Sequence, residues 1–198
     1  MNKKSRPGRL RIVAGKWRSR LLEITDVPGL RPTSERIRET LFNWLAPGIH
    51  GARCLDLFAG TGALGLEALS RGASEVVFVE KSRQAAAALR KNIASLEADG
   101  AELVHDDALR FLGEPDRKPF DIVFLDPPFA ADMASELCRL LDQAGLVTDG
   151  GQVYIEDDKS RPDVALPDGW HCEKTRQAGN VRYSLVRKGD RPDEGADR

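Results

Sequence analysis

The sequence has few cysteines and histidines and no long hydrophobic run. Its 198 residues include three cysteines and three histidines, both widely scattered. An odd number of distant cysteines fits neither a disulfide framework nor a zinc site, so we expect reduced thiols in a cytoplasmic protein and no bound metal. No apolar stretch approaches the roughly 18 residues of a membrane span, and the basic N-terminus lacks the apolar segment of a secretory signal.

The composition suits one globular domain, for which a monomer is the simpler expectation. Hydrophobic residues make up 41% of the chain and charged residues 31%. A chain of this length buries roughly 70% of its unfolded surface, so it can fold without disulfides or metals.

Charge is unevenly distributed along the chain. The formal net charge is -1, but residues 1–45 hold eleven Lys or Arg and four Asp or Glu, which gives this segment +7 and leaves -8 for the rest. A basic segment on an acidic body suggests nucleic acid as a partner, although a solvated N-terminus would look the same. The candidate RNA-binding residues are Arg9, Arg11, Lys16, Arg18, Arg20, Arg31, Arg36 and Arg38.

The N-terminal part divides into a tail, a ribbon and a helix. Residues 1–8 are expected to be a disordered basic tail, and residues 9–48 an RNA-binding extension. Within it, "RLRIVAGKWRSRLLEI" alternates around a turn, which predicts a two-stranded ribbon. A helix follows, with Thr33 as the expected N-cap. The expected apolar face of this helix consists of Ile37, Leu41, Trp44 and Leu45.

Strands alternate with helices from residue 53 onward. Short apolar runs such as "RCLDLFAG" and "FDIVFLD" are separated by helical segments, and two strand-like runs flank Ala178-Gly179 near the end. This predicts an α/β fold: a Rossmann-like, mostly parallel sheet with a C-terminal antiparallel hairpin, over residues 49–188. Residues 189–198 are expected to be a disordered tail. Ligands bind such sheets at the carboxyl ends of the strands, where acids cluster in this sequence. These acids are Asp56, Glu80, Asp106 or Asp107, and Asp126.

A glycine loop joins the first of these strands to a helix. The stretch "LDLFAGTGALGLEA" contains three glycines in the dinucleotide spacing, and Glu80 follows at the distance expected for a ribose ligand. Asp56, at the strand's end, would repel a pyrophosphate but attract the ammonium and sulfonium of S-adenosylmethionine. The loop therefore favours S-adenosylmethionine over NAD, with capping of the loop as the structural alternative for Asp56.

The stretch "HDDAL" gives weaker support for the same cofactor. Asp107 could accept a hydrogen bond from the adenine amine, with the Ala108 backbone nearby. The alternative is that Asp106 or Asp107 is simply the N-cap of the next helix.

The run "FDIVFLD", the fourth strand counted from residue 53, leads into Asp126-Pro127-Pro128-Phe129. Because proline has no backbone donor and a fixed φ, two prolines make a stiff corner with carbonyls that face outward. Asp126 and the Pro127 carbonyl could then accept both protons of an exocyclic amine, while the base stacks on Phe129. This arrangement would aim the nitrogen lone pair at an electrophilic methyl group. The alternative is an ordinary loop corner with Phe129 in the core.

With these motifs the chain resembles the amino-methyltransferases, and among them the bacterial small-subunit ribosomal RNA guanine-N2 methyltransferase family. The resemblance covers roughly residues 9 to 188, and "RPTSERIRETLFNWL" is its more family-specific part. The Asp-Pro-Pro-aromatic motif is shared with enzymes that act on adenine or cytosine. Phe129 stands where many relatives have tyrosine, which keeps the stacking ring and loses a hydroxyl.

The resemblance implies a seven-stranded methyltransferase sheet and transfer to the N2 amine of one guanine in 16S rRNA, in an assembled or assembling small ribosomal subunit. It assigns Asp126, Pro127, Pro128 and Phe129 to the target base. The implied S-adenosylmethionine-binding residues are Asp56, Phe58, Gly60, Gly62, Glu80, Lys81, Asp107 and Ala108.

Three other functions stay open at this point. A DNA adenine or cytosine amino-methyltransferase would share the catalytic motif, but no region resembles a DNA target-recognition domain. An NAD-dependent oxidoreductase would share the glycine loop. A non-catalytic RNA-binding assembly factor would share the basic segment.

Overall fold

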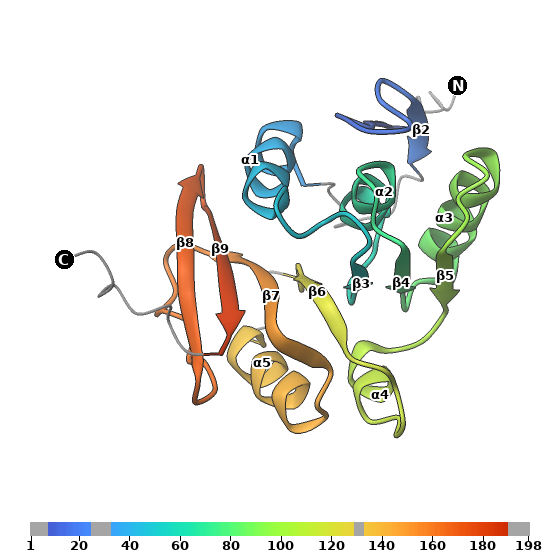
Figure 1. The fold of residues 1–198 in the computed structure, drawn as a ribbon. Coiled ribbons are helices and arrows are strands. Elements are labelled where there is room, and N and C mark those ends of the chain that lie inside the picture. The colour runs from blue at the N-terminus through green and yellow to red at the C-terminus, as the bar shows by residue number, and fades with distance from the viewer. Residues whose placement is uncertain (1–7, 25–32, 129–132, 190–198) are drawn as a thin grey trace, which may run out of the picture.

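Seven strands form one mixed sheet, and a two-stranded ribbon lies beside it (Figure 1). The computed structural model describes residues 8–24, 33–128 and 133–189. The first elements are β1 Gly8–Arg11, β2 Leu21–Ile24, α1 Glu35–Leu45, β3 Arg53–Asp56, α2 Ala63–Ser70, β4 Glu75–Val79 and α3 Arg83–Ser95. They are followed by β5 Ala101–Val104, α4 Ala108–Leu112, β6 Phe120–Leu125, α5 Ala134–Gln143, β7 Val147–Asp158, β8 Trp170–Ala178 and β9 Val181–Lys188.

The strand order in the sheet is β5-β4-β3-β6-β7-β9-β8. The first five strands in this order are parallel, and β9 runs antiparallel to both β7 and β8. The predicted α/β fold, with a mostly parallel seven-stranded sheet and a C-terminal antiparallel hairpin, is therefore confirmed. The chain moves outward from β3 to β5 and then returns to the other side of β3 with β6. This reversal creates the switch point beside which ligands bind in such sheets.

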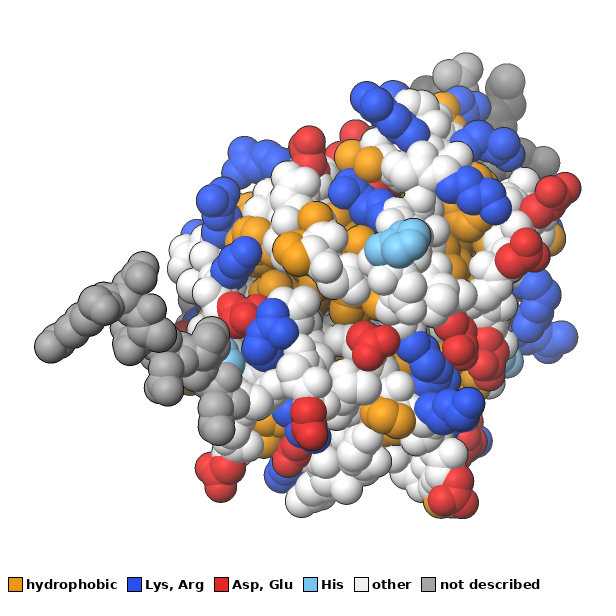
Figure 2. Space-filling model, viewed as in Figure 1, with side chains coloured by type: hydrophobic (Ala, Val, Ile, Leu, Met, Phe, Trp, Pro, Cys, Tyr) orange, Lys and Arg blue, Asp and Glu red, His pale blue; other side chains and the backbone are white. Residues whose placement is uncertain are grey.

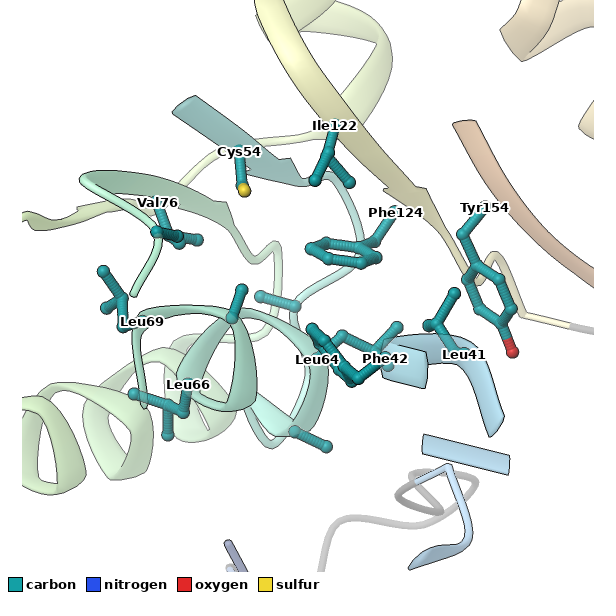
Figure 3. Close-up of a cluster of buried hydrophobic side chains, with 14 of the residues drawn as sticks. Leu41, Phe42, Cys54, Leu64, Leu66, Leu69, Val76, Ile122, Phe124 and Tyr154 are labelled. Atoms are coloured by element: carbon teal, nitrogen blue, oxygen red, sulfur yellow. The ribbon is translucent and has the colours of Figure 1, made fainter. Parts of the chain in front are cut away.

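Helices cover both faces of the sheet. The ribbon, α1, α2 and α3 lie on one face, and α4 and α5 lie on the other (Figure 1). On the first face, side chains of α1 and α2 meet those of the central strands, and the ring centroids of Phe42 and Phe124 lie 5.9 Å apart (Figure 3). Helix α1 buries the expected Ile37, Leu41 and Leu45 and also Phe42, whereas Trp44 is only partly buried. Trp44 instead stacks on Tyr183 of β9.

Helix α1 begins one residue later than Thr33 would require. Its N-cap is Ser34, whose hydroxyl accepts a hydrogen bond from the Ile37 backbone N–H at 3.3 Å. The expectation that Thr33 is the N-cap is therefore wrong. The Thr33 hydroxyl is buried and turned toward Asp126 at 3.3 Å.

The ribbon is packed tightly against α2. Strands β1 and β2 pair antiparallel, which confirms the predicted ribbon. In the connecting turn, the Lys16 backbone N–H donates to the Ser70 carbonyl at 2.6 Å, and the Trp17 backbone N–H donates to the Ser70 hydroxyl at 3.0 Å. Gly15 has φ +84°, and a Cβ atom there would lie 1.8 Å from the Ser70 carbonyl oxygen. Only glycine allows this close approach.

A buried carboxylate joins the ribbon to the helices. Glu67 of α2 is 0% exposed and accepts hydrogen bonds from the backbone N–H groups of Val13 and Ala14 at 2.8 and 3.0 Å. It also accepts from Arg38 of α1 at 3.1 Å and from Arg71 at 2.8 Å. Because both oxygens are fully used, the charge is compensated although it lies in the core.

The two predicted tails fall on residues 1–7 and 190–198, outside the described residues, although Gly8 already belongs to β1. Within the described segments, no helix has both the length and the apolar character needed to cross a membrane.

We predict that Glu67→Gln lowers the free energy of unfolding by about 3–5 kcal/mol, because it leaves the buried Arg38 guanidinium without a counter-charge. Urea unfolding followed by circular dichroism measures this loss. Glu39→Gln, at an exposed position of α1, is the matched control and should change stability by less than about 0.5 kcal/mol. A loss below about 1 kcal/mol for Glu67→Gln would contradict the assigned role.

Candidate active site

The predicted acidic residues meet at one edge of the sheet. Asp56 ends β3, Glu80 follows β4, Asp107 follows β5 and Asp126 follows β6. These four strands are parallel neighbours in the order β5-β4-β3-β6, so their carboxyl ends lie side by side. The structure thus brings the sequence-predicted acids together at the switch point.

Asp56 is a buried helix cap. It is 2% exposed, and its Oδ2 accepts the backbone N–H of Gly65 in α2 at 3.0 Å. The capping alternative therefore describes its contact within the chain. Burial, opposed by the Gly65 hydrogen bond, raises the pKa of Asp56 to about 7. A cationic ligand group beside this carboxyl would restore its charge, which fits the ammonium of S-adenosylmethionine.

Gly65 lets the loop and α2 lie close to the sheet. A Cβ atom at this position would lie 2.2 Å from the Phe78 ring of β4. Gly60 and Gly62 both have positive φ, +51° and +78°. Phe58, in the same loop, packs against the hydrophobic cluster on the α4 and α5 side.

Glu80 ties the glycine loop to the next strand. Its Oε2 accepts the backbone N–H of Gly60 at 2.7 Å, and its Oε1 accepts that of Ser82 at 2.6 Å. An ionised carboxylate has about four acceptor positions, so two remain after these bonds. These remaining positions fit the two hydroxyls of a ribose, as the sequence predicts.

Asp107 is also a cap, as the alternative proposed. Its Oδ1 accepts the Leu109 backbone N–H at 3.0 Å, and its Oδ2 accepts from the Lys81 ammonium at 2.9 Å. The Lys81 hydrogen bond and the Leu109 N–H lower the pKa of Asp107. Ala108 begins α4 and is buried. Contact of Lys81, Asp107 and Ala108 with a cofactor stays a prediction.

The corner after β6 presents Asp126 beside the glycine loop. Pro127 is buried and Pro128 is exposed, while Phe129 lies outside the described residues. Asp126 accepts a hydrogen bond from the Thr33 hydroxyl. Burial, followed by the neighbouring charges of Glu156 and Asp56, raises the pKa of Asp126 well above its ordinary value.

Sequence reasoning missed a second carboxyl at this corner. Glu156 of β7 is 5% exposed and accepts a hydrogen bond from the Tyr154 hydroxyl at 2.8 Å. Burial raises the pKa of Glu156, opposed by its hydrogen bonds from Tyr154 and Thr33. The available signal was the alternation in "VYIED", which places Tyr154 and Glu156 on one strand face, but the neighbouring strand is not visible in the sequence.

The basic residues of the extension differ in exposure. Lys and Arg side chains gather over the ribbon at the upper right of Figure 2. The described basic residues that are exposed there and on α1 are Arg9, Arg11, Lys16, Arg18, Arg20 and Arg36. Arg38 is 1% exposed and paired with Glu67, so its assignment to RNA binding is wrong. Arg31 lies outside the described residues.

A groove lies at the opposite edge of the sheet. It has a volume of about 920 Å³ and is lined by residues at the amino ends of β6, β7 and β8, among them Asp121, Thr148 and His171. Ligands of parallel sheets bind at the carboxyl ends, so this groove is not the candidate site. Among the residues that the structure describes, no group of three His, Cys, Asp or Glu side chains is placed to hold a metal ion.

Comparisons with known proteins agree along nearly the whole chain. Residues 10–187 match the family model described as "Conserved hypothetical protein 95". The ribosomal RNA small subunit methyltransferase D of Escherichia coli strain K12 is 43% identical over 190 residues, which cover 96% of each chain. A solved structure of a putative methyltransferase from Escherichia coli has a TM-score of 0.86 at 41% identity, over 93% of this chain and 100% of that one.

A more distant structure shares the fold. The RNA methyltransferase from Salinibacter ruber, solved in complex with S-adenosyl-L-homocysteine, has a TM-score of 0.62 at 19% identity. The match covers 85% of this chain and all of that one.

We predict that Glu80→Gln weakens binding of S-adenosylhomocysteine by roughly 10- to 100-fold, because hydrogen bonds to a charged group contribute about 1.5–3 kcal/mol. Isothermal titration calorimetry measures the affinity. Glu75→Gln, at the other end of β4 and paired with Arg53, is the matched control and should leave the affinity unchanged. Equal affinity of Glu80→Gln and the wild type would remove Glu80 from the cofactor site.

Proposed function

The chain belongs to the family of the ribosomal RNA small subunit methyltransferases D, and we propose that it transfers a methyl group from S-adenosylmethionine to the N2 amine of a guanine in 16S rRNA. Its substrate is an assembled or assembling small ribosomal subunit in the cytoplasm, on which it acts as a monomer. The family match over almost the full length supports methylation of rRNA rather than NAD chemistry. The choice of guanine N2 rests on the resemblance of the sequence motifs.

The observation that supports amine chemistry best is the position of Asp126-Pro127-Pro128. This corner follows β6, which lies directly beside β3 and its glycine loop. A base amine at the corner would donate one proton to Asp126 and one to the Pro127 carbonyl. Because these acceptors are fixed, the amine nitrogen becomes pyramidal and its lone pair points away from both of them.

The cofactor residues serve to bind and orient. S-adenosylmethionine supplies an electrophilic methyl group on a sulfonium. Asp56 places a carboxyl where positive charge is favoured, and Glu80 offers acceptors for the ribose. Asp107, held by Lys81 and by its own helix cap, offers an acceptor at the end of β5.

The exposed basic residues provide the contact with RNA. Arg18 and Arg20 lie in or beside the ribbon turn, which is fixed on α2, and Arg36 lies in the first turn of α1. Helix α1 begins just after Thr33, whose hydroxyl contacts Asp126. Phosphates bound by these residues would therefore hold the RNA next to the catalytic corner. RNA recognition of this kind reads shape and unpaired bases.

Incubation of the purified protein with radiolabelled S-adenosylmethionine and unmodified small subunits should give N2-methylguanosine in 16S rRNA, identified by mass spectrometry of the nucleosides. Asp126→Ala should abolish transfer and keep affinity for S-adenosylhomocysteine, because it removes one acceptor of the amine and leaves the glycine loop intact.

Deproteinised rRNA and duplex DNA are the comparison substrates. Methyladenine or methylcytosine in DNA would overturn the proposed substrate and keep the amine chemistry. Near-normal turnover of Asp126→Ala would show that this carboxyl does not hold the amine.

We predict that neutralising Arg18, Arg20 and Arg36 together weakens RNA binding and flattens its salt dependence. The slope of log K against log salt should fall by about 0.7–0.9 for each phosphate that the variant no longer neutralises. Titrations of subunits at several salt concentrations measure the slope. The matched control neutralises Arg110, Lys118 and Arg139, which are exposed at and near α4 and α5 on the other sheet face. An equal slope for the wild type and the first variant would show that Arg18, Arg20 and Arg36 do not bind RNA phosphates.

A further inference from the structure

The catalytic corner contains two carboxyls rather than one. Strands β6 and β7 are parallel, and Leu125 is the register partner of Ile155. The next residue on each strand is therefore Asp126 and Glu156, side by side at the carboxyl ends. Side chains alternate along a strand, so Glu156 points to the same face as Tyr154. That face is the α1 side, where Tyr154 lies beside Leu41 (Figure 3).

The Thr33 hydroxyl lies between these two carboxyls. Its oxygen is 3.3 Å from Asp126 Oδ2, and its hydrogen bonding also lowers the pKa of Glu156 against the larger effect of burial. Thr33 is held in place from behind, because its carbonyl accepts the Arg38 Nε at 3.2 Å and Arg38 is fixed by Glu67. A hydroxyl has one proton to donate and two lone pairs. It can therefore donate to one carboxyl while it accepts from the other.

The surroundings of the pair are acidic, and Glu156 and Thr33 are buried. The titratable groups that face it are Asp56 from the end of β3, Tyr154 from β7 and Tyr183 from β9. Burial raises the pKa of both Asp126 and Glu156, and the charge of Glu156 raises that of Asp126 further. Two such carboxyls do not ionise together readily, which favours a state in which the pair shares one proton.

The hydrogen bonds decide which member of the pair holds the negative charge. Glu156 accepts from the Tyr154 hydroxyl at 2.8 Å, which favours its ionised form. The one Thr33 proton can go to either carboxyl and lowers the pKa of both. When Thr33 turns its proton from Asp126 to Glu156, Asp126 can hold the shared proton on Oδ2, and its other oxygen remains an acceptor for the base. In this arrangement Asp126 can accept a hydrogen bond from the amine while the ionised Glu156 lies behind it.

We propose that Glu156 takes up the proton that the methylated amine releases, and that it receives this proton through Asp126 and the Thr33 hydroxyl. This inference rests on the proposed function only in that the acceptor is an exocyclic amine. Glu156 touches neither base nor cofactor and is in this sense a positioning residue.

Atoms and charges balance in this step. The nitrogen lone pair forms the bond to the methyl carbon, the carbon–sulfur bond breaks, and its electron pair stays on sulfur. The positive charge is then on nitrogen, whose proton passes to the free oxygen of Asp126. The proton on Oδ2 passes to Thr33, and the Thr33 proton passes to Glu156. Asp126 and Thr33 are again neutral, but the Asp126 proton now lies on the oxygen that faced the amine, so this carboxyl and the hydroxyl must turn before the next cycle. Glu156 is neutral until it returns its proton to water.

The first test compares Glu156→Gln with the wild type on unmodified subunits. Since a general base contributes about 10²–10⁴-fold, kcat should fall by about 10²-fold or more, with KM for both substrates nearly unchanged. In the wild type, kcat should rise with pH as the pair becomes singly ionised. In Glu156→Gln this rise should move to higher pH, because only Asp126, which lacks the Tyr154 hydrogen bond, is left to ionise.

The second test interrupts the path and leaves both carboxyls. Thr33→Val keeps the shape and removes the hydroxyl, so kcat should fall at least tenfold. Thr33→Ser restores the hydroxyl and should recover most of the activity. Loss of kcat in Thr33→Ser as large as in Thr33→Val would show that only packing matters and would overturn the proposal.

The third test needs no substrate. Infrared spectra of the free protein, recorded as pH rises, should show the Asp126 carboxyl losing its proton at lower pH in Glu156→Gln than in the wild type, because the Glu156 charge no longer raises its pKa. The same pH dependence of this carboxyl in both proteins, or a wild-type kcat and pH profile in Glu156→Gln, would overturn the relay. Because the spectra are recorded without RNA, they test the carboxyl pair independently of which substrate the protein methylates.

Discussion

The buried carboxylate of Glu67 holds together three parts of the molecule that are distant in sequence. It lies on α2, directly behind the glycine loop, and accepts hydrogen bonds from the ribbon turn and from Arg38 of α1. Arg38 in turn binds the carbonyls of Arg11 and Thr33. Because a buried charge must be fully compensated, these contacts form together. The basic ribbon, the cofactor loop and the residue beside Asp126 thereby hold fixed positions relative to one another.

The carboxyls at the candidate active site differ from that of Glu67 in their pKa values. Asp56, Asp126 and Glu156 all have pKa values above the ordinary carboxyl range, with burial as the first cause. A raised carboxyl pKa means that the folded state binds more protons than the unfolded chain. The corresponding stability is present at low pH and is lost as pH rises through the folded-state pKa. These acids therefore cost stability at neutral pH, which is typical of groups kept for binding and chemistry.

Much of the fold followed from local patterns. Strands such as Phe120–Leu125 are apolar runs of the right length, and the hairpin strands flank a turn at Gly179. The predictions for Thr33 and Arg38 were wrong because contacts with residues distant in sequence decide the roles of these two side chains. Thr33 and Ser34 are equally good caps by residue type, and packing of Thr33 against Asp126 left the cap to Ser34. Arg38 was assigned to the surface with the other basic residues, although it follows Ile37 on the buried side of α1 and meets a glutamate 29 positions away.

The order of strands and helices, the glycine loop and the acids at the strand ends could all be predicted from the sequence, because they depend on residues close together in the chain. The same holds for the stiff corner at Asp126-Pro127-Pro128, because proline fixes its own backbone. The position of Glu156 and Thr33 beside Asp126 became visible only in the folded molecule. Their meeting depends on the register of two parallel strands and on where α1 is held, and both are set by packing between distant segments.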